Sequence, residues 1–342
     1  MQQTHLPSET RPEINFQDEI KIAAVQMSPV FLDKQTSTQK VCTKIQEAAA
    51  QGSTVVGFPE SIIPGYPGWI EMLPLDQPKA HSLYQKLFLN AVEVPGPETA
   101  ALGEACRAAN VWAVVGITER LANTTRTLYN TQLTINPAGK IACKHRKYVP
   151  TLTERLMHTP GQTGSTASTM TPFGTLSALM CGENANPLAM YSLRLLYPVV
   201  HVASWPTHFA PGSDLENGIQ NSTHGLAYSL KCFVLNCVGV IDEGAMEAYG
   251  IDQRIQDYLK QERQKSLSSI IGPDGRTLTT PLETKEGILY ASVRPEDVLV
   301  PKYGMDFAGH YNRPELFAHH FENFMRQEGV GGQAKAVLDM SA

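Results

Sequence analysis

Short apolar runs alternate with helical patterns along most of the chain. Runs typical of buried strands cover residues 20–27, 54–58, 111–117, 175–180, 199–204 and 232–238. Between them, apolar side chains recur at helical spacing over residues 36–51, 80–92, 98–109, 187–196 and 213–231. This alternation predicts a protein of the α/β (α+β) class, with strands inside and helices outside.

Two hairpin patterns interrupt the alternation. Residues 128–135 and 140–147 flank an Asn-Pro-Ala-Gly turn, which is typical of an antiparallel pair. Residues 267–278 fold back around a Gly-Pro-Asp-Gly turn, and we expect them to pair with residues 287–293. Hairpins within an alternating series predict mixed sheets. We therefore expect two mixed sheets packed face to face, each covered by helices on its outer side.

The remaining segments are predicted from composition. Residues 1–17 are polar, lack the apolar core of a secretory signal, and are expected to be flexible. Residues 62–78 are rich in proline, glycine and aromatic side chains, so they predict a long loop that is a candidate pocket lid. Residues 301–342 show few periodic apolar positions and are expected to form an extended tail, used for oligomer contacts or partly disordered.

Charge and cysteine usage exclude several classes. The net charge of −5, with no basic block, argues against nucleic acid or an anionic membrane surface as a partner. No apolar run is long enough to span a membrane. The six cysteines are scattered singly and form neither a disulfide framework nor a metal-binding pattern, so we expect free thiols in the cytoplasm and neither metal nor cofactor.

Three predicted strands end in side chains that are suited to nucleophilic chemistry: Glu60, Lys147 and Cys181. Strand ends place side chains in a shared crevice, where a thiol, a carboxylate and an ammonium form a nucleophile, a base and an electrostatic stabiliser. A free thiol with a pKa near about 8.5 is mostly protonated at neutral pH. We expect Glu60 to accept its proton and Lys147 to favour the thiolate.

The sequence around these residues resembles the nitrilase branch of the carbon–nitrogen hydrolase superfamily. The resemblance lies in FPE at 58–60, HRKYVPTLTER at 145–155 and CGENANPLAMYSL at 181–193, and it extends from residue 23 to residue 317. It implies a four-layer α-β-β-α sandwich, a hydrolase domain over residues 18–300, and homo-oligomers built from dimers that can extend into spirals.

The resemblance also implies roles for individual residues. Cys181 matches the nucleophile, Glu60 the general base, Lys147 the catalytic lysine, and Glu154 the second glutamate that positions the lysine and water. The expected reaction is hydrolysis of a nitrile to a carboxylic acid and ammonia through a thioimidate and a thioester on Cys181. The backbone N–H of Gly182 is an additional candidate donor to the developing anion.

Four further residues are candidates for the substrate pocket. Tyr66 and Trp69 follow Glu60 in the aromatic loop, and Trp205 follows the strand after the nucleophile. His158 stands where similar proteins carry an aromatic residue, so it either lines the pocket or replaces a packing side chain. Gly182 replaces a common tryptophan, and the space it leaves favours an aryl or arylaliphatic nitrile.

Two alternatives to nitrile hydrolysis stay open on the sequence. An amidase or carbamoylase of the same superfamily would use the same four side chains on an amide. An inactive scaffold with the same fold is the more distant alternative, because it would have no need for an intact Glu60, Lys147, Glu154 and Cys181.

Overall fold

Two mixed β-sheets form the centre of the protein. The structure is a computed structural model that describes residues 13–125, 127–162, 167–283 and 285–327. The first sheet has six strands in the order β11-β1-β2-β3-β4-β5, and the second has five in the order β10-β9-β8-β7-β6. The strands of the first sheet are β1 (Ile20–Gln26), β2 (Ser53–Gly57), β3 (Trp112–Arg120), β4 (Leu128–Ile135), β5 (Ile141–Arg146) and β11 (Gly287–Val293). Those of the second are β6 (Ser168–Thr171), β7 (Gly174–Met180), β8 (Pro198–Trp205), β9 (Phe233–Val238) and β10 (Ser269–Ile271).

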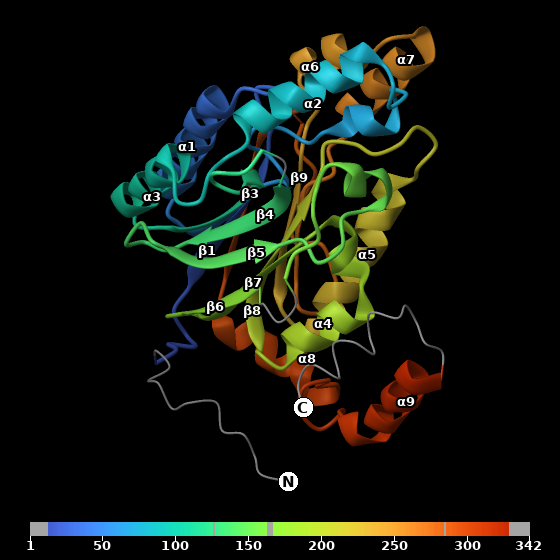
Figure 1. Cartoon of the computed structure of the whole chain (residues 1–342). Helices are drawn as coiled ribbons and strands as arrows, with labels where there is room; N and C mark the ends of the chain where they lie inside the picture. Colours follow the sequence, from blue (N-terminus) through green and yellow to red (C-terminus); the bar gives the residue numbers. More distant parts are fainter. Residues whose placement is uncertain (1–12, 126, 163–166, 284, 328–342) are drawn as a thin grey trace.

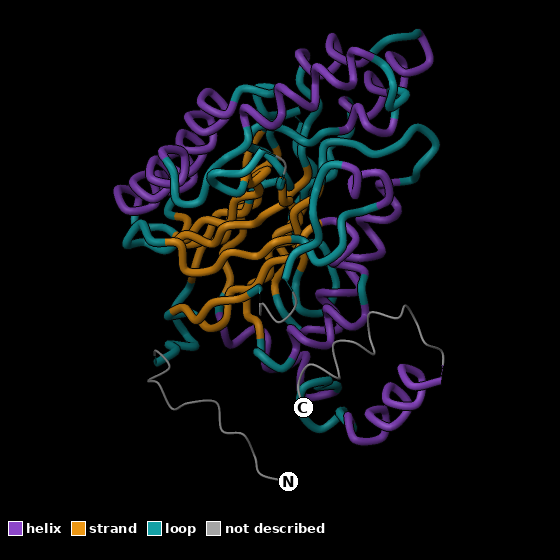
Figure 2. Tube along the Cα trace, in the orientation of Figure 1, coloured by secondary structure: helices purple, strands orange, loops and turns teal. Residues whose placement is uncertain are grey.

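Helices cover the outer face of each sheet (Figure 1). Helices α1 and α3 pack on the first sheet, and α4 and α5 pack on the second. Figure 2 shows the strands enclosed between these helical layers. The helices are α1 (Lys34–Ala50), α2 (Pro78–Asn90), α3 (Pro97–Ala109), α4 (Pro187–Arg194), α5 (Leu215–Leu230), α6 (Glu243–Tyr249), α7 (Gln253–Arg263), α8 (Leu299–Gly304) and α9 (Pro314–Gln327). Short 3-10 helices are η1 (Gly68–Glu71), η2 (Leu152–Leu156), η3 (Cys181–Ala185) and η4 (Pro295–Val298). The predicted α-β-β-α sandwich is confirmed.

The central strands are apolar on both faces because both faces are buried. On β1, Ala24 faces the second sheet, whereas Ala23 and Val25 pack toward α1 and α3. Parallel strands sandwiched in this way give the continuous apolar runs seen in the sequence. The pairs β1–β2, β2–β3, β7–β8 and β8–β9 are all parallel, so their carboxyl ends point the same way within each sheet.

The two sheets are bonded to each other at these carboxyl ends. The Glu60 amide donates to the Trp205 carbonyl at 3.1 Å, and the Gln132 side chain donates to Ser204 Oγ at 2.7 Å. Ser204 Oγ in turn donates to the Phe58 carbonyl at 2.7 Å. The ends of β2 and β8 are thereby held side by side, which sets the position of the residues that follow each strand.

The second predicted hairpin pairs differently from expectation. Its turn is present, with the Gly275 amide donating to the Gly272 carbonyl at 2.9 Å. However, β10 pairs with β9, and β11 pairs antiparallel with β1 in the other sheet. The expected partnership of residues 267–278 with 287–293 was therefore wrong, because alternation along a strand indicates its buried face and not its neighbour.

The predicted extended tail is also wrong for the residues described. Residues 299–304 and 314–327 form α8 and α9, and Pro314 occupies the first position of α9, where a missing N–H costs nothing. The helices α6 and α7, which the sequence patterns did not predict, close one end of the sandwich with α2. Residues 1–12 of the predicted flexible segment and 328–342 of the tail lie outside the described residues. In the described part of the chain, no helix has the length and apolar character needed to cross a bilayer.

Candidate active site

Glu60 lies in a tight turn directly after β2. Its side chain is buried, and its Oε1 atom is 2.7 Å from Lys147 Nζ. The turn runs against Gly116 of β3: a Cβ atom there would lie 2.4 Å from the Pro59 carbonyl oxygen and 2.9 Å from the Glu60 Cα atom. Glycine at position 116 therefore permits the close approach that aims Glu60 toward β5.

Lys147 and Glu154 come from the segment that follows β5. The Lys147 amide donates to the Asn130 carbonyl at 2.8 Å, which extends the β4–β5 ladder by one residue and fixes the lysine backbone. Glu154 lies in η2, and its Oε2 atom is 2.7 Å from Lys147 Nζ. The ammonium is thus held between two fully buried carboxylates, an arrangement that offsets the cost of burying each charge.

Asn130 of β4 joins the two carboxylates, and it is not among the site residues predicted from the sequence. Its Nδ2 atom donates to Glu60 Oε1 at 2.6 Å and to Glu154 Oε1 at 2.7 Å. Its Oδ1 atom accepts a hydrogen bond from Ser61 Oγ at 3.2 Å. The signal in the sequence was weak, because β4 contains other polar residues and its pattern does not single out Asn130.

The two carboxylates differ in their affinity for protons. Burial raises the pKa of Glu60 to about 7; Lys147 lowers it in part, and the negative charge of Glu154 raises it further. Burial also acts to raise the pKa of Glu154, but Lys147 and His158 outweigh it, so that the pKa lies well below its usual range. Burial opposes the charge on Lys147, yet its two carboxylate partners raise its pKa well above the usual value. The site therefore combines a fixed ion pair with a carboxyl group that exchanges protons near neutral pH.

Cys181 occupies a strained turn at the end of β7. It is the first residue of η3 and has a φ of 47°, a left-handed conformation that non-glycine residues rarely adopt. Glu183 supports this turn: its Oε2 atom accepts from the Met180 amide at 3.0 Å, and its Oε1 atom accepts from the Tyr148 amide at 2.7 Å. One buried carboxylate thus connects the cysteine turn to the residue after Lys147.

The thiol of Cys181 is protonated in this environment. Burial and the neighbouring charge of Glu60 raise its pKa to about 12, although Lys147 and a hydrogen bond from the Gly182 amide act in the opposite direction. Lys147 does favour the thiolate, but burial outweighs its effect, and its ammonium is shared by two carboxylates. A base must remove the proton as the sulfur attacks.

Glu60 has an oxygen atom free for this task. In the described part of the chain, its Oε2 atom is buried and has no hydrogen-bond partner. Its Oε1 atom is occupied by Lys147 and Asn130. The influence of Glu60 on the Cys181 pKa indicates that the two side chains are neighbours. The group with a pKa near neutrality is thus also the one with a free acceptor atom.

A mostly apolar cavity of about 280 Å³ opens beside Cys181. Gly182 faces it, and a Cβ atom at that position would meet no neighbour closer than 4.0 Å. Trp205 lies at the end of β8 and lines the same cavity. The remaining lining residues are Thr151, Ala185, Phe209, Ser213, Asp214, Leu215, Gly218 and Ser222.

Comparison with known proteins identifies the family. The family model for carbon–nitrogen hydrolases matches residues 21–300. The chain belongs to the carbon–nitrogen hydrolase family. It is 32% identical over 308 residues to an arylacetonitrilase of Aspergillus oryzae, an alignment that covers 87% of this chain and 90% of that protein. It is also 33% identical over 318 residues to an aliphatic nitrilase of Rhodococcus rhodochrous, and that alignment covers 90% of this chain and 84% of the relative. The predicted membership of the nitrilase superfamily is confirmed.

Solved structures share the fold of this carbon–nitrogen hydrolase. An amidase of the nitrilase superfamily from Nesterenkonia has a TM-score of 0.61 and 15% identity, and the match covers 88% of this chain and 96% of that one. A Saccharomyces cerevisiae member of branch 10 of the superfamily has a TM-score of 0.62 and 17% identity, and the match covers 86% of this chain and 97% of that one. Both support the two-sheet sandwich.

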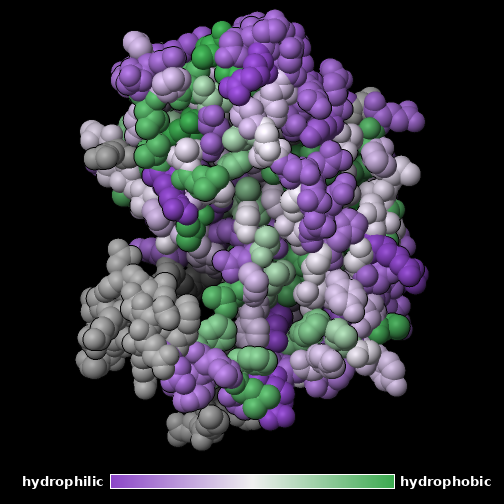
Figure 3. Space-filling view, turned by 90° about the vertical axis from the view of Figure 1, so that its right-hand side faces the viewer, coloured by the Kyte–Doolittle hydropathy of each residue, from purple (hydrophilic) through white to green (hydrophobic). Residues whose placement is uncertain are grey.

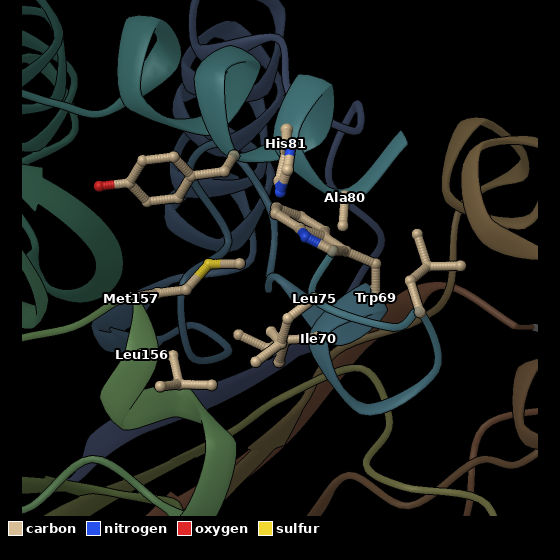
Figure 4. A pocket seen from close by; sticks show the side chains of 9 residues that line it. Trp69, Ile70, Leu75, Ala80, His81, Leu156 and Met157 are labelled. Atoms are coloured by element: carbon tan, nitrogen blue, oxygen red, sulfur yellow. The ribbon is translucent and has the colours of Figure 1, made fainter. Parts of the chain in front are cut away.

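The other pocket candidates of the hydrolase lie in different surroundings. Tyr66 is buried close to Glu154, Glu60 and Cys181, and burial followed by these charges raises its pKa well above the usual value. Trp69 lines a separate cavity of about 380 Å³ between η1, α2 and η2, where its ring lies near His81 and Ala80 (Figure 4). Trp69 therefore does not face the Cys181 cavity, contrary to expectation. His158 lines neither cavity and contacts Glu154 instead.

The part of the chain that the structure describes holds no group of three or more potential metal ligands.

Proposed function

We propose that the protein hydrolyses an organic nitrile to a carboxylic acid and ammonia, with Cys181 as the nucleophile. The observation that carries this proposal is the position of Cys181 between an apolar cavity and the buried Glu60–Lys147–Glu154 group. Relatives named as arylacetonitrilase and nitrilase, at 32% and 33% identity over most of the chain, support the choice of a nitrile.

The first half of the proposed reaction forms a thioimidate. Sγ of Cys181 attacks the nitrile carbon while its proton passes to the free Oε2 atom of Glu60. One π-bond of the nitrile breaks, and the nitrogen receives the proton from Glu60. The Lys147 ammonium and the Gly182 N–H stabilise the negative charge that develops during this step.

The second half releases ammonia and the acid. A water molecule adds to the thioimidate carbon, and Glu60 takes a proton from the water and passes it to the nitrogen, which gives a tetrahedral intermediate. Expulsion of ammonia leaves a thioester on Cys181. A second water molecule adds to the thioester and expels the thiol, which regenerates the enzyme. If the first intermediate expels the thiol instead, the product is the amide.

The cavity favours aryl or arylaliphatic nitriles. Its wall is formed by Trp205, Phe209 and Leu215, which offer apolar and aromatic surface to a ring. Gly182 leaves open space directly beside the sulfur. A substrate with a ring separated from the nitrile by a short spacer would occupy this space and keep the nitrile carbon at Cys181.

The test is product analysis with a small panel of substrates. Purified enzyme is incubated with phenylacetonitrile, benzonitrile, an aliphatic dinitrile and the matching amides, and ammonia and acid are measured. We expect acid and ammonia from nitriles, with the highest kcat/KM for phenylacetonitrile. Turnover of amides alone would instead assign an amidase activity, and no turnover of any compound would contradict the proposal.

Filling the cavity next to the nucleophile should change substrate preference. Because a Cβ atom at position 182 has room, Gly182→Trp should fold normally and place its ring in the cavity. We expect kcat/KM to fall by more than about tenfold for phenylacetonitrile and by less than about threefold for a small aliphatic nitrile. Gly182→Ala is the matched control, and it should resemble the wild type. Equal losses for both substrates would exclude the space beside Gly182 as the ring site.

A second copy of the chain is the protein partner that we propose. Helix α9 carries Leu316, Phe317 and Phe321, each more than half exposed. Figure 3 views the side of the molecule that carries α5 and α9, and it shows hydrophobic side chains in patches among hydrophilic ones. Such patches are typical of subunit contacts. Light scattering should give a mass that is a multiple of 37.5 kDa, and a monomer at all concentrations would contradict the proposal.

A further inference from the structure

Four hydrogen bonds surround the carboxylate of Glu154. Its Oε1 atom accepts from Asn130 Nδ2 at 2.7 Å and lies 2.9 Å from His158 Nδ1. Its Oε2 atom accepts from Lys147 Nζ at 2.7 Å and from the Thr151 amide at 2.9 Å. An ionised carboxylate offers about four lone-pair positions in total, so the acceptor capacity of Glu154 is filled.

Glu60 has the same types of neighbour but fewer hydrogen bonds. Lys147 and Asn130 both bind its Oε1 atom, and in the described structure its buried Oε2 atom has no partner. The two carboxylates share one ammonium and one amide, so these groups do not distinguish them. The contacts found at Glu154 alone come from the Thr151 amide and from His158.

The state of the His158 ring follows from its contacts. Because a carboxylate oxygen can only accept, Nδ1 must carry the hydrogen. Nε2 is buried and has no hydrogen-bond partner among the described residues. The Nδ1–H group is therefore the part of the ring that His158 presents to Glu154.

The backbone holds this ring firmly against Glu154. The His158 amide donates to the Glu154 carbonyl at 2.8 Å, and the next amide, of Thr159, donates to the Leu128 carbonyl at 2.8 Å. Residue 158 therefore sits at the junction of η2 and β4, and its side chain is buried. Little rotation is available to the ring in this position.

We propose that His158 is a positioning residue whose Nδ1–H occupies the last free site of the Glu154 carboxylate. This contact keeps Glu154 ionised and fixed beside Lys147, so that proton transfer in the site is confined to Glu60. The charged and titratable groups around this pair are Lys147 from the end of β5, Glu60 from the turn after β2, Cys181 from η3 and Tyr66 from the loop after Glu60.

The turnover assay of this inference rests on the proposed function, because it needs a nitrile substrate. A second assay, which needs no substrate, is therefore added. The experiment compares His158→Asn with His158→Phe. Asparagine places an N–H donor near the position of Nδ1, whereas phenylalanine retains the shape of the ring and removes the donor. A hydrogen-bonding role predicts that asparagine is the better replacement, and a packing role predicts that phenylalanine is.

For His158→Phe we expect kcat to fall by about 10- to 100-fold, the effect of losing one charge-assisted hydrogen bond, while KM changes by less than about threefold. His158→Asn should retain kcat within about threefold of the wild type. The second assay measures the rate of Cys181 alkylation by iodoacetamide, followed by peptide mass spectrometry. As with kcat, we expect this rate to be closer to the wild-type value in His158→Asn than in His158→Phe.

His208→Asn is the matched control. His208 is a fully buried histidine that contacts Thr207 and Tyr249, away from Glu154, and its loss should leave both rates near the wild-type values. Thermal unfolding of all variants shows whether each one folds. Wild-type rates in His158→Phe, or higher rates in His158→Phe than in His158→Asn, would overturn the inference. If the wild type turns over no nitrile, the proposed function fails, and the alkylation rates still test His158.

Discussion

Cys181→Ala should reduce turnover of every substrate by more than about 10⁴-fold, because no other group can form the covalent intermediate. Of the five other cysteines, Cys106, Cys232 and Cys237 are buried, and Cys42 and Cys143 are half-buried. Rapid quenching of the wild type with substrate should give a protein mass increased by the bound acyl or imidoyl group. Peptide mapping should locate that group on Cys181, and the variant should show no increase.

The loss in Cys181→Ala should not reflect unfolding. The substitution removes one sulfur atom beside an open cavity, so we expect the thermal midpoint to stay within a few degrees of the wild type. Cys42→Ala is the control for removing a thiol elsewhere, and it should retain full activity. A covalent adduct on another cysteine, or residual turnover above about 1% of the wild type, would contradict the assignment of the nucleophile.

Lys147→Met should destabilise the protein by about 3–5 kcal/mol at pH 7.5 and remove activity. The substitution leaves Glu60 and Glu154 buried without their shared cation, and an unpaired buried charge is strongly unfavourable. Urea unfolding measures the loss. Lys144→Met is the matched control on the preceding strand, β5. Lys144 is partly exposed, and its buried partner Glu119 keeps Arg146 as a second cation, so we expect a cost below about 1 kcal/mol.

The destabilisation by Lys147→Met should shrink as the pH falls. In the wild type, Lys147 holds the pKa of Glu154 below its unfolded value, and this contribution to stability is present above that value and is lost in acid. Without Lys147, burial raises the pKa of both carboxyl groups above their unfolded values. They then bind protons in the folded state, so the variant gains stability from pH 7.5 to pH 5. If the free energy of unfolding of the variant stayed below that of the wild type by a constant amount across this range, the result would contradict the buried ion pair.

The sequence predicted the strands that carry the site but not all of its contacts. Glu60, Lys147 and Cys181 were recognisable because each stands at the end of a predicted strand, and local patterns report strand ends well. The roles of Asn130 and His158 depend on contacts with residues in other segments, and single-sequence patterns carry no information about such distances. The same limit explains the wrong partner for β11, which binds β1 from the far end of the chain.

The helices at the carboxyl end were missed for a different reason. In α9, Leu316, Phe317 and Phe321 recur at helical spacing, but these apolar side chains are exposed and none packs into the core, so a pattern of this kind did not indicate a helix of the sandwich. The helix propensity of its residues and a proline at the first position also indicate a helix, but these indications are weaker than a buried apolar face.

The charged group and the cavity wall come from different parts of the chain. Glu60, Lys147 and Glu154 precede residue 155, whereas most of the wall is formed by residues 205–222, between the end of β8 and the first half of α5. Mutations that reshape the wall can therefore accumulate without disturbing the buried ion pair. This separation makes the scaffold evolvable: new substrates become accessible through one surface segment while the reactive centre is inherited unchanged, and that segment is the natural place to diversify in a library.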